Sequence, residues 1–238
     1  MGNGMLEFGF GEGDERVGQK SKRFKGKEGE TYRVSFVWWP GLAEGKPDLT
    51  APTPRFIGCR RLYIQGVGYF IDKGPEYVKL AGGAQSKMQA ATIICVWPTN
   101  NKGVIDKGRF ANGEYSVQSW IMSADKYRSV EARHQEFPLS GHDVTLACTD
   151  TQFQKMDISP CRESLFKMLL DKNPERAQAI IADAQAIAST LANDLAQDLT
   201  LDQIRDKMGR GGSSPVASGS VASNASGDFD NMLDDLVK

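Results

Sequence analysis

The feature that most constrains the fold of this chain is a change in its hydrophobic pattern near Ser159. Before it, in the stretch TYRVSFVW at residues 31–38, aromatic and β-branched residues alternate with Arg33, Ser35 and Val37. Such a period of two is typical of a β-strand. After Ser159, apolar residues recur at helical spacing instead. We therefore expect a β body followed by a helical extension.

Further strands are predicted between residues 31 and 158, where turn signals such as Ala111-Asn112-Gly113 separate short apolar segments. These segments are residues 60–65, 69–72, 91–97, 114–122, 143–149 and 153–158. One helix interrupts the series, with Ser123 as its N-cap and Phe137-Pro138 at its end. Many short strands with one inserted helix indicate a mainly β fold, an OB-like barrel with long loops.

The helical extension contains three start signals. Ser159-Pro160 and Asn173-Pro174 each place a capping residue before a proline, which suits the first turn of a helix. The second signal opens a long Ala-rich helix whose apolar stripe consists of Ile180, Ala184, Ile187, Leu191 and Leu195. Thr200 and Gln203 form a capping box that starts a last helix, which ends at Gly209.

The chain therefore divides into four parts. Residues 1–30 are a flexible basic arm, 31–158 an OB-like nucleic-acid-binding domain, 159–209 the helical extension, and 210–238 a flexible Gly/Ser-rich linker with an acidic tip. The longest apolar run, from Ala90 to Trp97, is too short to span a membrane, and the N-terminus has no signal-peptide pattern. We expect no membrane contact and a cytoplasmic location.

The net charge of −1 conceals a strong asymmetry along the chain. Residues 16–133 hold 20 Lys and Arg against 10 Asp and Glu, whereas residues 139–238 hold 9 against 15. A basic body with an acidic remainder favours a polyanionic ligand for the body, with the acidic part held apart from it.

Groups able to carry out catalysis are few. His134 and His142 are the only histidines, and their spacing from Cys148 and Cys161 matches no common zinc motif. A core thiol at Cys148 with both histidines on the surface explains this set better, and a two-His, two-Cys zinc site is the alternative. Gly82-Gly83 lacks the second half of a P-loop. We expect no enzyme activity, no cofactor and no metal.

Nucleic-acid binding is better supported, because single-strand binders combine a cationic groove with aromatic side chains on which bases stack. Here Lys and Arg recur next to aromatic residues throughout the basic body. The candidate DNA-binding residues are Lys20, Lys22, Arg23, Lys25, Lys27, Arg33, Trp38, Arg55, Arg60, Arg61, Tyr63, Lys73, Tyr77, Lys79, Lys102, Lys107, Arg109, Phe110, Tyr127 and Arg128. The number of basic residues predicts an affinity that falls with salt.

The acidic tip interleaves carboxylates with apolar side chains, a pattern suited to docking into basic, apolar pockets of partner proteins. Its candidate partner-binding residues are Asp228, Phe229, Asp230, Met232, Leu233, Asp234, Asp235 and Leu236. A merely solubilising tail would not need the apolar members of this set.

The order of basic arm, β body, helical section, linker and acidic tip resembles the single-stranded DNA-binding proteins of tailed phages. Residues 114–159, EYSVQSWIMSADKYRSVEARHQEFPLSGHDVTLACTDTQFQKMDIS, are similar in their strand, helix, strand and strand to the later part of that family's binding domain. Some members hold a structural zinc through a Cys/His cluster, which this chain lacks, so zinc is not carried over.

The resemblance implies a protein that coats single-stranded DNA in phage replication, recombination and repair, in the host cytoplasm. It also implies that residues 20–27 support cooperative self-association and that residues 228–236 recruit replication or recombination proteins. The alternative is a phage transcription regulator or polymerase accessory protein that works through the helices at 160–208. An enzyme acting on nucleic acid ranks third.

Overall fold

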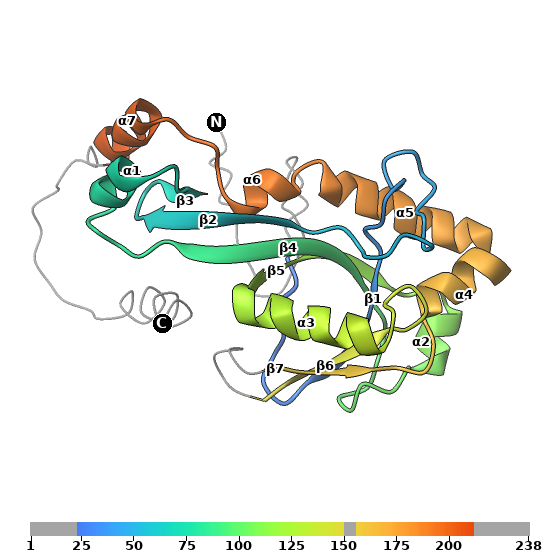
Figure 1. Ribbon diagram of the computed structural model, residues 1–238. Helices are drawn as coiled ribbons and strands as arrows, with labels where there is room; N and C mark the ends of the chain where they lie inside the picture. The colour runs from blue at the N-terminus through green and yellow to red at the C-terminus, as the bar shows by residue number, and fades with distance from the viewer. Residues whose placement is uncertain (1–22, 150–155, 212–238) are drawn as a thin grey trace, which may run out of the picture.

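The computed structural model describes residues 23–149 and 156–211, in which seven strands form one antiparallel sheet (Figure 1). The strands are β1 (Thr31–Phe36), β2 (Ile57–Ile64), β3 (Gly68–Ile71), β4 (Lys87–Val96), β5 (Ser116–Ser123), β6 (Val144–Cys148) and β7 (Met156–Pro160). The helices are α1 (Pro75–Leu80), α2 (Lys107–Ala111), α3 (Ala124–Glu136), α4 (Leu165–Lys172), α5 (Pro174–Ala188), α6 (Leu191–Leu195) and α7 (Leu201–Gly211).

Strand β4 lies at the centre of the sheet. One of its edges pairs with β5 over nearly its whole length, and the other edge is shared between β2 and β1. Strand β1 also pairs with β6, which in turn pairs with β7. Strand β2 also pairs with β3. The β2–β3 hairpin is thus a branch inserted beside the path β7-β6-β1-β4-β5.

Helices cover both faces of the sheet, which is why β4 reads as a continuous apolar run and not as an alternating one. On one face, Ile93 and Cys95 pack against Phe166 of α4 and Ile180 of α5. On the other face, Ile94 belongs to a second core that is closed by α3. In Figure 1, α5 and α6 lie above the sheet and α3 lies on its other side.

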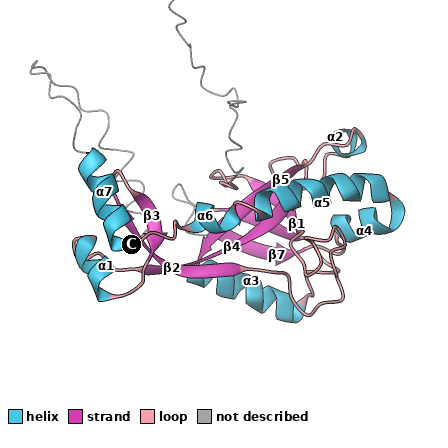
Figure 2. Ribbon diagram, turned by 90° about the horizontal axis from the view of Figure 1, so that it is seen from above, coloured by secondary structure: helices cyan, strands magenta, loops and turns pink. Residues whose placement is uncertain are grey.

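A third, smaller core holds the β2–β3 hairpin in place. Leu62 and Phe70 of the hairpin pack with Ile204 of α7. The backbone of Gln197 adds a further link, because its N–H donates to the Tyr69 carbonyl at 3.0 Å and its carbonyl accepts from the Ile71 N–H at 3.0 Å. Figure 2 shows α1 and α7 beside β3 at one end of the molecule, far from α2 and α4.

The mainly β body and the helical C-terminal extension are confirmed. The sheet is open, since no ladder joins β5 to β7 within residues 23–149 and 156–211. Helix starts with a local capping bond are also confirmed: Ser123, Asn173 and Thr200 accept from the backbone N–H three residues later. No helix in the described part of the chain is long and apolar enough to cross a membrane. The linker and acidic tip lie outside the described residues.

Two helix predictions are wrong. Ser159-Pro160 does not start a helix, because Pro160 pairs with Val144 at the end of β7, and α4 begins at Leu165 with Ser164 as its N-cap. Proline is tolerated there because β7 is an edge strand. The expected long Ala-rich helix is divided into α5 and α6, and the last helix extends to Gly211. Helices α1 and α2 were not anticipated.

The basic arm is docked where the structure describes it, in contrast to the flexible segment expected up to residue 30. Phe24 is buried, with its ring edge-on to Tyr32 and Trp120 at centroid distances of 5.2 and 6.1 Å. The Phe24 N–H donates to the Ser119 carbonyl on β5 at 2.7 Å, and the Gly29 N–H donates to Cys148 on β6 at 2.9 Å. Residues 23–29 therefore run from β5 to β6.

Replacing Gly26 by Ala should destabilise this docked segment. A Cβ at this position would overlap the Sγ of Cys148, which is itself buried. Overpacking of this kind costs about 1–3 kcal/mol, so Gly26→Ala should lower the urea midpoint of unfolding. Gly108→Ala is the control, because a Cβ there would be 3.5 Å from the nearest atom, Asp106 Oδ1. Equal midpoints for the two variants would contradict the tight approach at Gly26.

Candidate nucleic-acid interface

The docked segment presents a row of cations to solvent. Arg23, Lys25 and Lys27 are exposed, whereas Phe24 and Gly26 between them are buried. This alternation arises because an extended chain directs successive side chains to opposite sides. Since Phe24 is anchored between Tyr32 and Trp120, the three cations are held on the outer side of the segment.

A pair of tyrosines lies on the β2–β3 hairpin. Tyr63 and Tyr69 are directly opposite one another in the ladder, and their ring centroids are 5.0 Å apart. The guanidinium of Arg61 stacks on the Tyr69 ring at 3.8 Å and donates from Nη1 to the Leu195 carbonyl at 2.9 Å. Tyr63 keeps 42% of its surface exposed, so its ring remains available for a further stacking partner.

Electrostatic coupling links the cation row to the tyrosine pair. Burial lowers the pKa of Arg61 to about 10, with the nearby Tyr69 opposing the shift and the charge of Arg23 adding to it. Arg61 therefore stays protonated at neutral pH, and Arg23 lies close enough to interact with both members of the stack. We call the set Arg23, Lys25, Lys27, Arg61, Tyr63 and Tyr69 the basic–aromatic surface.

Other predicted DNA-binding cations are engaged in contacts within the protein. Arg60 Nε donates to Ser86 Oγ at 3.0 Å, Lys73 pairs with Asp198, Arg109 pairs with Glu114 at 2.7 Å, and Arg128 pairs with Asp125 at 3.3 Å. These pairs are solvent-exposed and lie on separate elements. Exposed ion pairs contribute little to stability, and they do not gather into one surface.

The remaining predicted aromatics pack against the body. Trp38 is half-buried against the core under α5, and the Tyr77 hydroxyl donates to the Leu199 carbonyl at 3.3 Å. Phe110 lies between Trp97 and the Arg176 guanidinium, and Tyr127 packs edge-on to Phe56. Their rings are mainly used in packing, in contrast to that of Tyr63.

Four predicted cations are exposed but dispersed: Arg55, Lys79, Lys102 and Lys107 lie on different loops and helices. Lys20, Lys22 and the partner-binding residues at 228–236 lie outside the described residues. Of the predicted set, the structure thus places Arg23, Lys25 and Lys27 on one docked segment, with Arg23 near Arg61, and Tyr63 two residues from Arg61 on β2.

Arg33, another of the predicted DNA-binding cations, is held by contacts within the protein. Its Nε donates to Asp143 Oδ2 at 2.9 Å, and its Nη2 donates to the Glu163 carbonyl at 3.0 Å. Burial raises the pKa of Asp143, while hydrogen bonds from Ser35 and Arg33 and the Arg33 charge oppose that shift. The Leu165 N–H also donates to Asp143 at 3.2 Å. The Arg33 guanidinium thus neutralises a carboxylate that has no exposed surface.

Sequence reasoning missed two residues of this interface. The sequence predicts Tyr69 only as part of a strand, although its position opposite Tyr63 makes it the stacking partner of that ring. The sequence predicts Phe24 only as part of a flexible arm, although it is buried and anchors the cation row. A tight turn at Gly66 to Gly68 between two tyrosine-bearing segments was the available signal for the first. No local signal marks the second, because its partners are distant in the chain.

The histidines serve local contacts. His142 Nδ1 lies 2.9 Å from the Cys161 carbonyl oxygen, and His134 contacts Pro52 and Leu139. Within the described residues, no three His, Cys, Asp or Glu side chains lie close enough together to hold a metal ion.

No family model, curated protein or solved structure matches the chain. A functional assignment therefore depends on the geometry of the basic–aromatic surface and on the sequence pattern.

Replacing Arg33 by Met should destabilise the protein by about 3–5 kcal/mol at pH 7, because it leaves the buried Asp143 carboxylate without its counter-ion. The loss should shrink toward pH 5. Removing Arg33 raises the folded-state pKa of Asp143 further, so the variant gains more stability than the wild type as this carboxyl protonates.

Urea unfolding at several pH values measures both effects. Arg109→Met is the matched control, since its partner Glu114 is exposed and the expected cost is only about 0–1 kcal/mol. A loss for Arg33→Met that is as small as the control, or independent of pH, would contradict the role assigned to the pair.

Proposed function

We propose that this protein binds single-stranded DNA with little sequence preference, through the basic–aromatic surface, and acts in DNA replication, recombination and repair without catalysing a reaction. The observation that carries the proposal is the alternation of Arg23, Lys25 and Lys27 on a docked segment whose Arg23 lies near the stacked Arg61 and Tyr69. Cations that follow the backbone and aromatic rings that stack bases are the two requirements of sequence-tolerant binding.

The spacing of the cation row suits a phosphate chain. Side chains two residues apart on an extended segment are separated by about 7 Å, so each of Arg23, Lys25 and Lys27 meets a different phosphate. Tyr63 offers an exposed ring on which a base stacks. The Tyr69 ring packs against the Tyr63 ring, and the Arg61 guanidinium stacks on Tyr69. None of these contacts depends on the identity of the base.

The strand order supports an OB-type body. The path β7-β6-β1-β4-β5, with α3 between β5 and β6, is that of a five-stranded barrel opened between its third and fifth strands. The docked residues 23–29 run from β5 to β6 at that opening. OB-folds bind oligonucleotides on their second and third strands and on the loop after the first, and the β2–β3 hairpin occupies that loop here.

The tail and the rest of the arm complete the proposal. The acidic tip at residues 228–236 recruits replication or recombination proteins, and Lys20 and Lys22 contribute to contacts of the arm with DNA or with a neighbouring molecule in cooperative binding. A phage protein of this kind acts in the host cytoplasm. The transcription-regulator alternative gains no support, because the apolar faces of α4 and α5 pack on the sheet.

Replacing Lys25 and Lys27 together by Gln should weaken binding to oligo-dT and flatten its salt dependence. Loss of two phosphate contacts lowers the slope of log K against log salt by about 1.4 for a single strand. Fluorescence anisotropy at several salt concentrations measures this slope.

Lys167→Gln with Lys172→Gln is the matched control, because both lysines are exposed on α4 and the change in net charge is the same. Equal slopes for the two double variants would show that the cation row does not contact phosphates. Failure of the wild-type protein to bind oligo-dT at low salt would overturn the proposed function itself.

Tyr63→Ala should weaken oligo-dT binding about 5- to 150-fold, since stacking contributes about 1–3 kcal/mol per base. Tyr63→Phe should retain the affinity because the ring remains. Met88→Ala is the control: Met88 is 48% exposed but pairs with Arg60, whose side chain is on the opposite face of the sheet from Tyr63. Similar affinities for the Tyr63→Ala and Met88→Ala variants would exclude base stacking on Tyr63.

A further inference from the structure

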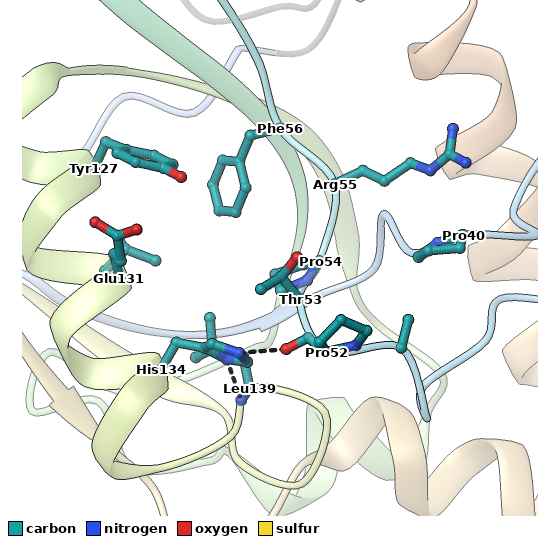
Figure 3. Close-up of a pocket in the computed structure, with 12 residues that line it drawn as sticks. Pro40, Pro52, Thr53, Pro54, Arg55, Phe56, Tyr127, Glu131, His134 and Leu139 are labelled. Atoms are coloured by element: carbon teal, nitrogen blue, oxygen red, sulfur yellow. Dashed lines mark hydrogen bonds between the residues drawn. The ribbon is translucent and has the colours of Figure 1, made fainter.

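A second site lies on the α3 side of the sheet, away from the tyrosine pair. It is a cavity of about 400 Å³ between α3 and the proline-rich segment at residues 51–56 (Figure 3). This volume is in the range of small-molecule sites. The sequence pattern gave no indication of it, because its two walls come from segments about 75 residues apart in the chain.

The wall of the cavity is fixed by His134. The Leu139 N–H donates to His134 Nδ1 at 3.2 Å, which leaves Nε2 as the protonated ring nitrogen. Nε2 lies 2.6 Å from the Pro52 carbonyl oxygen and donates to it. Both ring nitrogens are therefore used to join α3 to the segment at 51–56, so His134 shapes the cavity without offering a polar group to a ligand.

The floor of the cavity is apolar and aromatic. Phe56 and Tyr127 meet edge-to-face with ring centroids 5.1 Å apart, and Val130 and Leu139 continue the surface. In Figure 3 the rings of Phe56 and Tyr127 lie together at one side of the cavity, with Glu131 below Tyr127. A flat, weakly polar body such as a nucleobase suits this floor.

The charged group beside the aromatic floor is the carboxylate of Glu131. Glu131 follows Tyr127 by four residues on α3 and thus lies on the same face of the helix. Glu131 is exposed at the mouth of the cavity, and within the described residues its carboxylate has no hydrogen-bond or ion-pair partner. On the facing wall Pro52 and Pro54 have no N–H to offer, and Thr53 between them adds an exposed hydroxyl. The Glu131 carboxylate therefore favours a ligand edge that carries N–H donors and disfavours a phosphate.

The rim of the cavity carries a positive charge, in contrast to the negative charge of Glu131. Arg55 is exposed, and its guanidinium extends away from the two rings in Figure 3. In the described part of the chain this guanidinium has no hydrogen-bond or ion-pair partner. A cation there repels a basic peptide side chain, which would otherwise satisfy Glu131, and attracts an anionic group attached to the ligand.

We propose that this cavity binds a guanine nucleotide, with the base on the Phe56 and Tyr127 floor, its edge donating to Glu131, and its phosphate near Arg55. Guanine presents two adjacent donors, N1–H and the N2 amino group, which match the two oxygens of one carboxylate. Adenine and cytosine each present one amino donor beside an acceptor, and thymine presents one N–H between two carbonyl groups. The site thus selects guanine by its donor pattern.

The test is calorimetric titration of the full-length protein with dGMP, dAMP, dCMP and dTMP, without DNA. We expect dGMP to bind at least tenfold more tightly than dTMP, and Glu131→Gln to remove at least tenfold of the dGMP affinity. Glu136→Gln, on the same helix but outside the cavity, should leave it unchanged. Arg55→Gln should weaken dGMP but not deoxyguanosine, which has no phosphate.

Equal binding of the four nucleotides, no binding of dGMP at millimolar concentration, or no effect of Glu131→Gln would overturn the proposal. Competition then separates two sources of the guanine. Displacement of dGMP by oligo-dT containing one dG, but not by oligo-dT alone, assigns the site to a base of a bound strand; no displacement assigns it to the free nucleotide. Because dGMP binding is measured without DNA, its failure leaves the single-stranded DNA proposal intact, and the converse also holds.

Discussion

The structure depends on the burial of β4 on both faces and the pairing of both its edges. Residues 90–95 of this strand are all buried. One edge holds β5, and the other holds β2 and β1, which lie far apart in the chain. A one-residue slip would exchange Ile93 and Ile94 between the two cores and displace every neighbouring strand. The positions of α3 on one face and α5 on the other follow from the same register.

The Arg33–Asp143 pair adds specificity where three elements meet. Asp143 precedes β6, Arg33 lies on β1, and the Leu165 N–H that donates to Asp143 begins α4. A buried carboxylate is costly unless it is paired and hydrogen-bonded. The contacts from Arg33, Ser35 and Leu165 meet that requirement only in this arrangement. The ion pair thus favours the native position of α4 against β1, even if its net contribution to stability is modest.

Sequence reasoning succeeded where the determining interaction is local. The capping bonds of Ser123 and Asn173 involve residues three positions apart, and the helix starts they mark are observed. Prediction from the sequence failed where the conformation or the contacts of a residue are set by a partner far away in the chain. Pro160 ends a strand because Val144 pairs with it, and Arg33 is withdrawn from any interface by Asp143, 110 residues away. Phe24 is fixed by Trp120, which is 96 positions away, so its packing in the core could not be predicted from the arm's own sequence.

The same anchoring connects the fold to its proposed ligand. A lysine on an unstructured arm loses much conformational freedom when it binds a phosphate, whereas Lys25 is already held because its neighbours Phe24 and Gly26 are buried. Part of the ordering cost is therefore met during folding and not during binding. The cavity beside Glu131 is lined by Phe56, Tyr127 and Val130, which belong to the same hydrophobic core as Phe24. One core, around Ile94 and Trp120, thus holds both the segment that carries the cation row and the walls of the second cavity.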